Sequence, residues 1–172
     1  MKPLVVAALA ALVLALGPPA RAAEEWGLPD EEVVRFEARV VDVLCELTGD
    51  CAQACGGGTR QLGLIDDQGA LIIAHKNVVP FAGAAAELID FCGQQVIADG
   101  LFSTNRGVRV FVLQFVREAP EGKWRRANRF LPKWGKEQGV DPESDAAKAW
   151  FRNDPRVKAR LAGEGKLGLG PE

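Results

Sequence analysis

Tyrosine, histidine and methionine are almost absent from this chain of 172 residues. There is no tyrosine, the one methionine is Met1 and the one histidine is His75. A hydrolase of the Ser-His-Asp type needs a histidine base and a serine nucleophile, and no glycine-flanked serine elbow occurs, so that chemistry is disfavoured. Residues 56–58 are all glycine but lack the Lys-Ser/Thr pair of a phosphate-binding loop. We therefore predict no catalytic residues and interpret His75 as a histidine at the end of a hairpin.

The chain also lacks any long hydrophobic run beyond residue 22. Its one unbroken apolar stretch, 4–16, follows Lys2 and ends before two prolines. Residues 20–22 read Ala-Arg-Ala, the small-x-small pattern of signal peptidase sites, so we expect a signal peptide over 1–22, cleaved after Ala22 or Ala23. The stretch is shorter than the ~20 residues of a membrane-spanning helix, and an uncleaved N-terminal anchor is the alternative. We predict a periplasmic or secreted protein with no transmembrane segment after cleavage.

Four cysteines follow the predicted leader, and an even number in an exported chain favours disulfides. They are Cys45, Cys51, Cys55 and Cys92, so three pairings are possible. Cys51 and Cys55 share one short loop, whereas Cys45 is expected to end a strand and Cys92 to end a helix. We therefore expect Cys51 to pair with Cys55, and Cys45 with Cys92.

The spacing Cys-x-x-x-Cys, followed later by a histidine, resembles the copper-handling thioredoxin-like proteins of the periplasm. That resemblance implies a Cu(I) site made of Cys51, Cys55 and His75, since thiolates suit Cu(I). The sequence departs from that family because glycines at 56–58 replace the expected helix, the usual proline is missing and no methionine lies beyond residue 1. Zinc is disfavoured because Cys-x-x-Cys pairs are absent. A metal site therefore stays an alternative, and we expect no cofactor.

Charge is divided unevenly along the chain. Residues 24–105 hold 4 basic and 14 acidic side chains, whereas residues 106–172 hold 15 basic and 9 acidic ones. Such asymmetry arises when a basic tail folds against an acidic body, or when the tail binds an acidic partner. We favour the first interpretation, because a contact within the chain requires no further assumption.

The body of the chain has the periodicity of strands with one helix. Five strands are predicted, over 31–47, 60–65, 70–74, 95–102 and 108–118. The first changes phase partway, which indicates a bulge or bend, and the second and third form a hairpin around Asp66–Gly69. Apolar residues at helical spacing between Pro80 and Gly93 predict a short helix, with Glu87 and Asp90 off its apolar stripe.

This order, with a long bent first strand, a hairpin and a helix between the third and fourth strands, resembles the OB-fold. The resemblance covers 33–117, and a hairpin like Leu62–Leu71 and a Val-x-x-x-Gly pattern like 96–100 are common in small periplasmic OB-fold proteins. It implies a mainly β (β+α) chain whose residues 24–120 form a five-stranded OB-like barrel with one inter-strand helix. A different small antiparallel barrel or sandwich is the alternative.

A helical C-terminal extension is predicted over 121–162, followed by a disordered, glycine-rich tail over 163–172. The extension carries one basic and aromatic cluster, made of Lys123, Trp124, Arg125, Arg126 and Arg129. This cluster could bind an acidic partner or an anionic membrane surface. We favour the alternative that Trp124, Phe130 and Trp134 dock the extension on the barrel, while the arginines face solvent or pair with acidic residues.

Together these features favour an exported, disulfide-stabilised binding or accessory module without catalytic activity. Its ligand, a protein or a small molecule of acidic character, is expected near loop 51–58 or at the basic extension. Nucleic acid is disfavoured because the predicted barrel is acidic and has no tyrosine to stack on bases. Two alternatives remain: a periplasmic thiol-redox or copper-handling protein using Cys51 and Cys55, and an enzyme whose Asp or Glu residues converge only in the folded chain.

Overall fold

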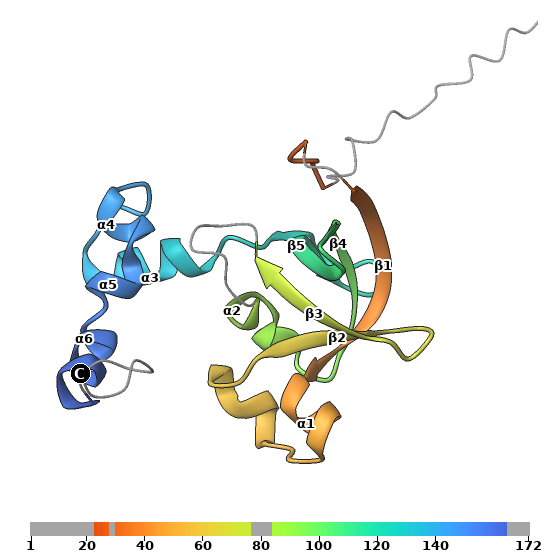
Figure 1. Cartoon of the computed structure of the whole chain (residues 1–172), viewed down its shortest axis with the longest axis horizontal. Helices are drawn as coiled ribbons and strands as arrows, with labels where there is room; N and C mark the ends of the chain where they lie inside the picture. The colour runs from red at the N-terminus through yellow and green to blue at the C-terminus, as the bar shows by residue number, and fades with distance from the viewer. Residues whose placement is uncertain (1–22, 28–29, 77–83, 165–172) are drawn as a thin grey trace, which may run out of the picture.

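A closed five-stranded barrel forms the body of the molecule in a computed structural model that describes residues 23–27, 30–76 and 84–164. Its strands are β1 (Glu31–Asp42), β2 (Leu62–Asp66), β3 (Leu71–Lys76), β4 (Gln95–Asn105) and β5 (Val108–Glu118). Antiparallel pairs follow the order β3-β2-β1-β4-β5, and a parallel pairing of β3 with β5 closes the sheet (Figure 1). The prediction of a mainly β chain with an OB-like barrel is confirmed.

Alternating residues of the strands fill the barrel. The side chains of Ala38 and Val40 in β1 and of Val96 and Ala98 in β4 are fully buried in one core cluster. The register of β4 and β5 shifts between Asp99 and Gly100, where Gln114 of β5 is the extra residue. A Cβ atom at Gly100 would overlap the carbonyl oxygen of Val112 in the neighbouring strand, so only glycine allows the strands to approach this closely.

The first strand is shorter than predicted, because β1 ends at Asp42 and a helix, α1 (Val43–Thr48), follows. The Asp42 side chain accepts the backbone N–H groups of Leu44 and Cys45, which caps the helix. Gly49 then ends it in the left-handed conformation. The pairings of β1 contain no register shift, so the predicted bulge is wrong, and the strand is bent instead (Figure 1). The later apolar positions of the pattern, Val43 and Cys45, belong to the helix.

Between β3 and β4 lies a short helical segment, α2 (Ala85–Leu88) continued by the tight turn η2 (Ile89–Phe91). Ala84 and Leu88 of the predicted apolar stripe are fully buried. Glu87, predicted to lie off that stripe, is also buried. The start of the predicted helix, at Pro80, lies outside the described residues.

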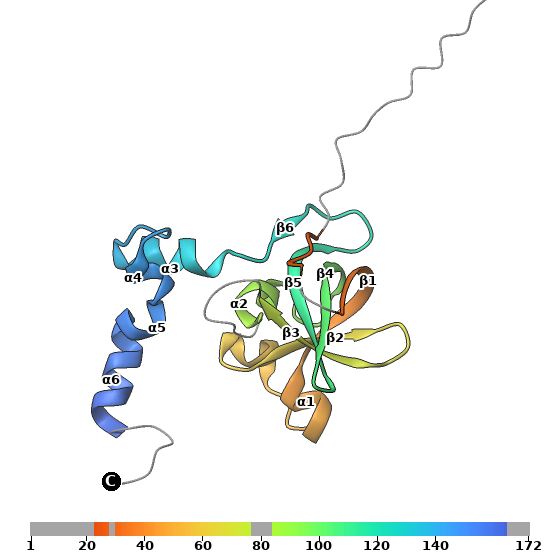
Figure 2. The same cartoon turned by 45° about the horizontal axis from the view of Figure 1, so that its top comes forward.

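The extension begins with a two-residue strand, β6 (Arg125–Arg126), which pairs with β5 and was not predicted. Its helices are α3 (Phe130–Gln138), α4 (Asp145–Lys148), α5 (Trp150–Asn153) and α6 (Pro155–Glu164). Figures 1 and 2 both place α4 to α6 to one side of the barrel, with α3 leading back to it. None of the helices in the described part of the chain is long and apolar enough to cross a bilayer. The predicted signal peptide and residues 165–172 of the tail lie outside the described residues.

Candidate functional site

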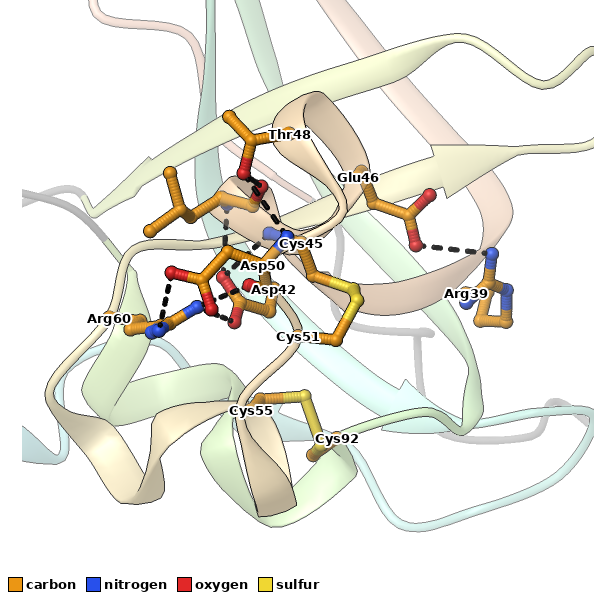
Figure 3. The surroundings of a disulfide bond; sticks show 11 residues. Arg39, Asp42, Cys45, Glu46, Thr48, Asp50, Cys51, Cys55, Arg60 and Cys92 are labelled. Carbon is orange, nitrogen blue, oxygen red and sulfur yellow. Dashed lines mark hydrogen bonds and ion pairs between the residues drawn. A yellow bond between two sulfur atoms is a disulfide. The ribbon is translucent and has the colours of Figure 1, made fainter.

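A left-handed turn, η1 (Gln53–Gly58), lies against one end of the barrel and is called the glycine loop below. Ala54 and Cys55 have φ angles of 47° and 50°, and the glycines at 56–58 continue with positive φ. Residues with a side chain lose roughly 1–2 kcal/mol each in this conformation, which explains the glycine run. Cys55 is 8% exposed, and its bridge to Cys92 at the end of η2 ties the loop to the barrel (Figure 3).

All four cysteines are bridged, but the predicted pairing is wrong. The disulfides join Cys45 to Cys51 and Cys55 to Cys92 (Figure 3). Cys45 lies in a helix rather than at a strand end, and the left-handed Gly49 turns the chain back so that the Cα atoms of Cys45 and Cys51 are 4.3 Å apart. Cys55 is thereby left to face Cys92, at a Cα separation of 5.9 Å.

Arg60 joins the residue that caps α1 to the loop that follows this helix. Its Nη1 donates to Oδ2 of Asp42 at 3.1 Å, and its Nη2 donates to Oδ2 of Asp50 at 3.2 Å (Figure 3). Because Asp42 also caps α1, one buried carboxylate holds both the helix and the segment that leads to the glycine loop.

Carboxylates of α2 and η2 attach the extension to the barrel. Glu87, which is 1% exposed, accepts the backbone N–H groups of Arg129 at 3.2 Å and Phe130 at 3.1 Å. The first N–H groups of a helix have no partner within it, so Glu87 caps α3 from another element. Asp90 accepts from Arg125 at 2.9 Å and from Arg129 at 2.8 Å, and the Arg129 guanidinium lowers the pKa of this carboxyl. The favoured interpretation, a basic tail that folds against the acidic body, is confirmed for these two arginines.

Lys76, at the end of β3, lies close to the place where α3 docks on the barrel. It is 4% exposed, and its ammonium is 4.1 Å from the centre of the Phe130 ring. Burial lowers its pKa, while the negative charge of Glu87 acts in the opposite direction. Two buried charges of opposite sign therefore meet the first turn of α3.

A cleft of about 410 Å³ opens between the glycine loop and the docked extension. Its lining includes Gly57, Gly58, Ile89, Phe130, Lys133 and Trp134. The cleft therefore combines exposed backbone of the loop, apolar and aromatic side chains, and a lysine. Both regions in which the sequence predicts a ligand, the loop 51–58 and the basic extension, contribute to it.

Three cations and two carboxylates line the cleft. The three cations differ in whether a carboxylate pairs with them. Arg129 pairs with the cleft residue Asp90, and Arg156 with Asp154 behind it. Lys133 is exposed and forms no ion pair with any residue that the structure describes. Lys133 is consequently the cation best placed to meet a negative group from outside.

Only one of the five predicted partner-binding residues, Arg129, lines the cleft. Arg125 pairs with a carboxylate of η2, Arg126 lies over an aromatic ring of β5, Trp124 packs against two arginines of the barrel, and Lys123 is exposed. Sequence reasoning missed Lys133, although it follows Arg129 by four residues. That spacing places two side chains on the same face of a helix.

The alternative metal site made of Cys51, Cys55 and His75 is not assembled in this structure. Each of the two cysteines is bridged to a different partner outside the predicted set. His75 lies in β3, where burial lowers its pKa. In the described residues, no group of three or more His, Cys, Asp or Glu side chains is placed to hold a metal ion.

Trp134 lines the cleft and is held by a buried carboxylate. Its Nε1 donates to Oδ2 of Asp154 at 2.8 Å, and Asp154 also caps α6 by accepting the N–H groups of Arg156 and Val157. The hydrogen bond from the Arg156 side chain, followed by those from Trp134 and the backbone, holds the pKa of Asp154 far below its ordinary value. One charged side chain thus joins α3 to α6.

We expect Asp154→Asn to lower the free energy of unfolding by about 2 kcal/mol at pH 7, because hydrogen bonds to a buried charge are lost. The pKa of Asp154 is lower in the folded than in the unfolded chain. Its contribution is therefore fully present above the unfolded pKa of about 4, decreases as the pH falls below that value, and is lost as the pH passes through the much lower folded pKa. Denaturation at pH 7 and pH 3 measures this, and the difference between wild type and variant should shrink at pH 3. An equal difference at both pH values would contradict it.

Comparison with protein-family models, with curated proteins and with solved structures finds no match to this chain in any of the three.

Proposed function

We propose that this chain is an exported, disulfide-stabilised binding module that acts in the periplasm by recognising an acidic segment of a partner protein in the cleft between the glycine loop and α3. The observation that supports it is the cleft itself, since residues about seventy positions apart in sequence meet there around Lys133, which pairs with no carboxylate in the part of the chain that the structure describes. The proposed activity is binding, with no chemical step of its own.

The lining of the cleft favours a ligand that is both acidic and apolar. Lys133 offers an ammonium without a partner among the described residues, and Arg129 lies one turn before it. Ile89 and Phe130 offer an apolar wall beside these charges. A carboxylate flanked by apolar side chains meets both surfaces at once, whereas a basic ligand would face the ammonium of Lys133, which pairs with no carboxylate among the described residues.

The glycine loop offers backbone to such a ligand. Gly57 and Gly58 are exposed, and a Cβ atom at either position would meet no other atom within 4 Å. Their amide and carbonyl groups can therefore be approached closely by an extended peptide. The bridge between Cys55 and Cys92 holds the loop in place, so little ordering of the loop is required on binding.

The leader-like N-terminus and the cysteines support the proposed export. Two disulfides in a chain of this size fit an oxidising compartment, because cytosolic thiols are kept reduced. The apolar run at 4–16, followed by Ala-Arg-Ala, supplies a route to that compartment.

Substitution of Lys133 by glutamate tests the proposed site. A short capped peptide of alternating Glu and Leu serves as the probe, and its Lys and Leu counterpart serves as the negative control. We expect Lys133→Glu to weaken binding of the acidic peptide by about tenfold or more, which corresponds to about 1.4 kcal/mol. Isothermal titration calorimetry on the oxidised protein measures both affinities.

The matched control is Lys136→Glu, which makes the same change of charge in α3 at an exposed position that does not line the cleft. We expect this variant to bind the acidic peptide within about threefold of wild type, because an exposed charge at a distance is screened by salt. If both variants lost the same affinity for the acidic peptide, binding would depend on the overall charge of α3. That result would contradict the cleft as the binding site. Preference for the basic peptide would contradict the proposed ligand.

A further inference from the structure

The first described residue, Ala23, donates its backbone N–H into the barrel. The donor is 2.8 Å from Oδ1 of Asp99, and Ala23 is 8% exposed. Asp99 lies in β4 and is 1% exposed. The other oxygen of this carboxylate accepts Nε of Arg35 in β1 at 2.7 Å. A buried negative charge thus faces the amide nitrogen of Ala23.

The segment that starts at Ala23 is fastened to the barrel along its length. The buried side chain of Gln114 donates to the carbonyl of Glu24 at 2.7 Å and accepts its N–H at 3.0 Å. The N–H groups of Trp26 and Gly27 both donate to Glu31 at 2.9 Å. Contacts of residues 23–27 with the barrel therefore help to position the Ala23 nitrogen.

We propose that processing cuts the bond between Ala22 and Ala23, and that the new α-ammonium of Ala23 forms a buried ion pair with Asp99 that locks the mature barrel. The sequence allows cleavage after Ala22 or after Ala23. Cleavage after Ala23 would remove the nitrogen that Asp99 binds, whereas cleavage after Ala22 keeps it and gives it a charge. The contact with Asp99 therefore favours cleavage between Ala22 and Ala23.

The chemistry is the hydrolysis of one amide by a signal peptidase. Water supplies the hydroxyl that completes the Ala22 carboxyl and a proton to the Ala23 nitrogen, which takes up a second proton from solvent near neutral pH. A neutral N–H donor thereby becomes an ammonium facing a buried carboxylate. Charge-assisted hydrogen bonds are roughly twice as strong as neutral ones. Cleavage should therefore strengthen the contact between the Ala23 nitrogen and Asp99, and so stabilise the barrel.

The first test is the N-terminal residue of the protein exported by its native host, determined by sequencing and intact mass. We expect Ala23 as the first residue. A first residue of Glu24, or a retained residue before Ala23, would overturn the proposal.

The second test compares the oxidised chain that begins at Ala23 with the same chain acetylated only at its α-amino group. Acetylation restores the neutral N–H of the unprocessed chain, so we expect it to lower the thermal midpoint by about 3 °C or more. In an Asp99→Asn background the difference should fall below about 1 °C. Equal midpoints for the free and acetylated native chains would overturn the ion pair, even if the Asp99→Asn variant failed to fold. Neither test involves the cleft, so failure here is distinct from failure of the proposed function.

Discussion

Replacing both Cys55 and Cys92 with alanine is expected to lower the free energy of unfolding by about 4 kcal/mol. The bridge closes a loop with a sequence separation of 37 residues, and a cross-link restricts the unfolded chain more strongly as the loop lengthens. It also holds Cys55 in a left-handed conformation, which a residue with a side chain does not favour. Urea denaturation of the oxidised variant, followed by tryptophan fluorescence, measures the loss.

The matched control replaces Cys45 and Cys51 with alanine. This bridge spans a separation of only 6 residues, for which the same model gives about 2 kcal/mol. The long bridge should therefore contribute about twice as much as the short one. Equal losses would show that restriction of the unfolded chain is not the main contribution. The variant without the long bridge should also bind the Glu and Leu peptide more weakly, because the glycine loop is released.

Replacing Glu87 with glutamine is expected to cost about 3 kcal/mol and to release the extension from the barrel. The two oxygens of Glu87 each accept one N–H group of α3, and glutamine offers only one acceptor atom with a similar shape. The buried Lys76 would also lose the negative charge that offsets its burial. Denaturation measures the energy, and faster proteolysis within the extension reports its release.

Asp90→Asn is the control for this junction. Asp90 pairs with two arginines, but its side chain is 46% exposed, so the ion pairs should contribute less than about 1 kcal/mol. We expect the extension of this variant to stay docked and to resist proteolysis as in the wild type. If Asp90→Asn were as destabilising as Glu87→Gln, surface charge rather than the buried cap would hold the extension.

The barrel could be predicted from the sequence because its strands alternate in pattern. The hairpin over β2 and β3 and the strands β4 and β5 lie where apolar alternation and turn residues predict them. The end of β1 could not be predicted in the same way, since Val41, Val43 and Cys45 continue the alternation. The decisive signals were Asp42 and Gly49, a helix cap and a helix stop around six residues. The wrong disulfide pairing followed from missing that helix.

The cleft is harder to predict, because it depends on a contact between a side chain and a distant backbone. Glu87 was expected off the apolar face of its helix, and its partners are N–H groups 42 and 43 residues further along the chain. Every residue except proline has a backbone N–H group, so the type of a residue does not show that its N–H binds a distant side chain. Nothing in the sequence therefore identifies Glu87 as a cap. The charge asymmetry did predict that the basic half contacts the acidic half, but not the residues that do so.

The most direct test of the cleft as a binding site is a map of backbone amide shifts by NMR while the Glu and Leu peptide is added to the oxidised protein. The largest shifts are expected at Gly57 and Gly58 and around Lys133, with the face of the barrel remote from the cleft unchanged. Saturable shifts confined to that remote face, or no shifts at millimolar peptide, would contradict the account.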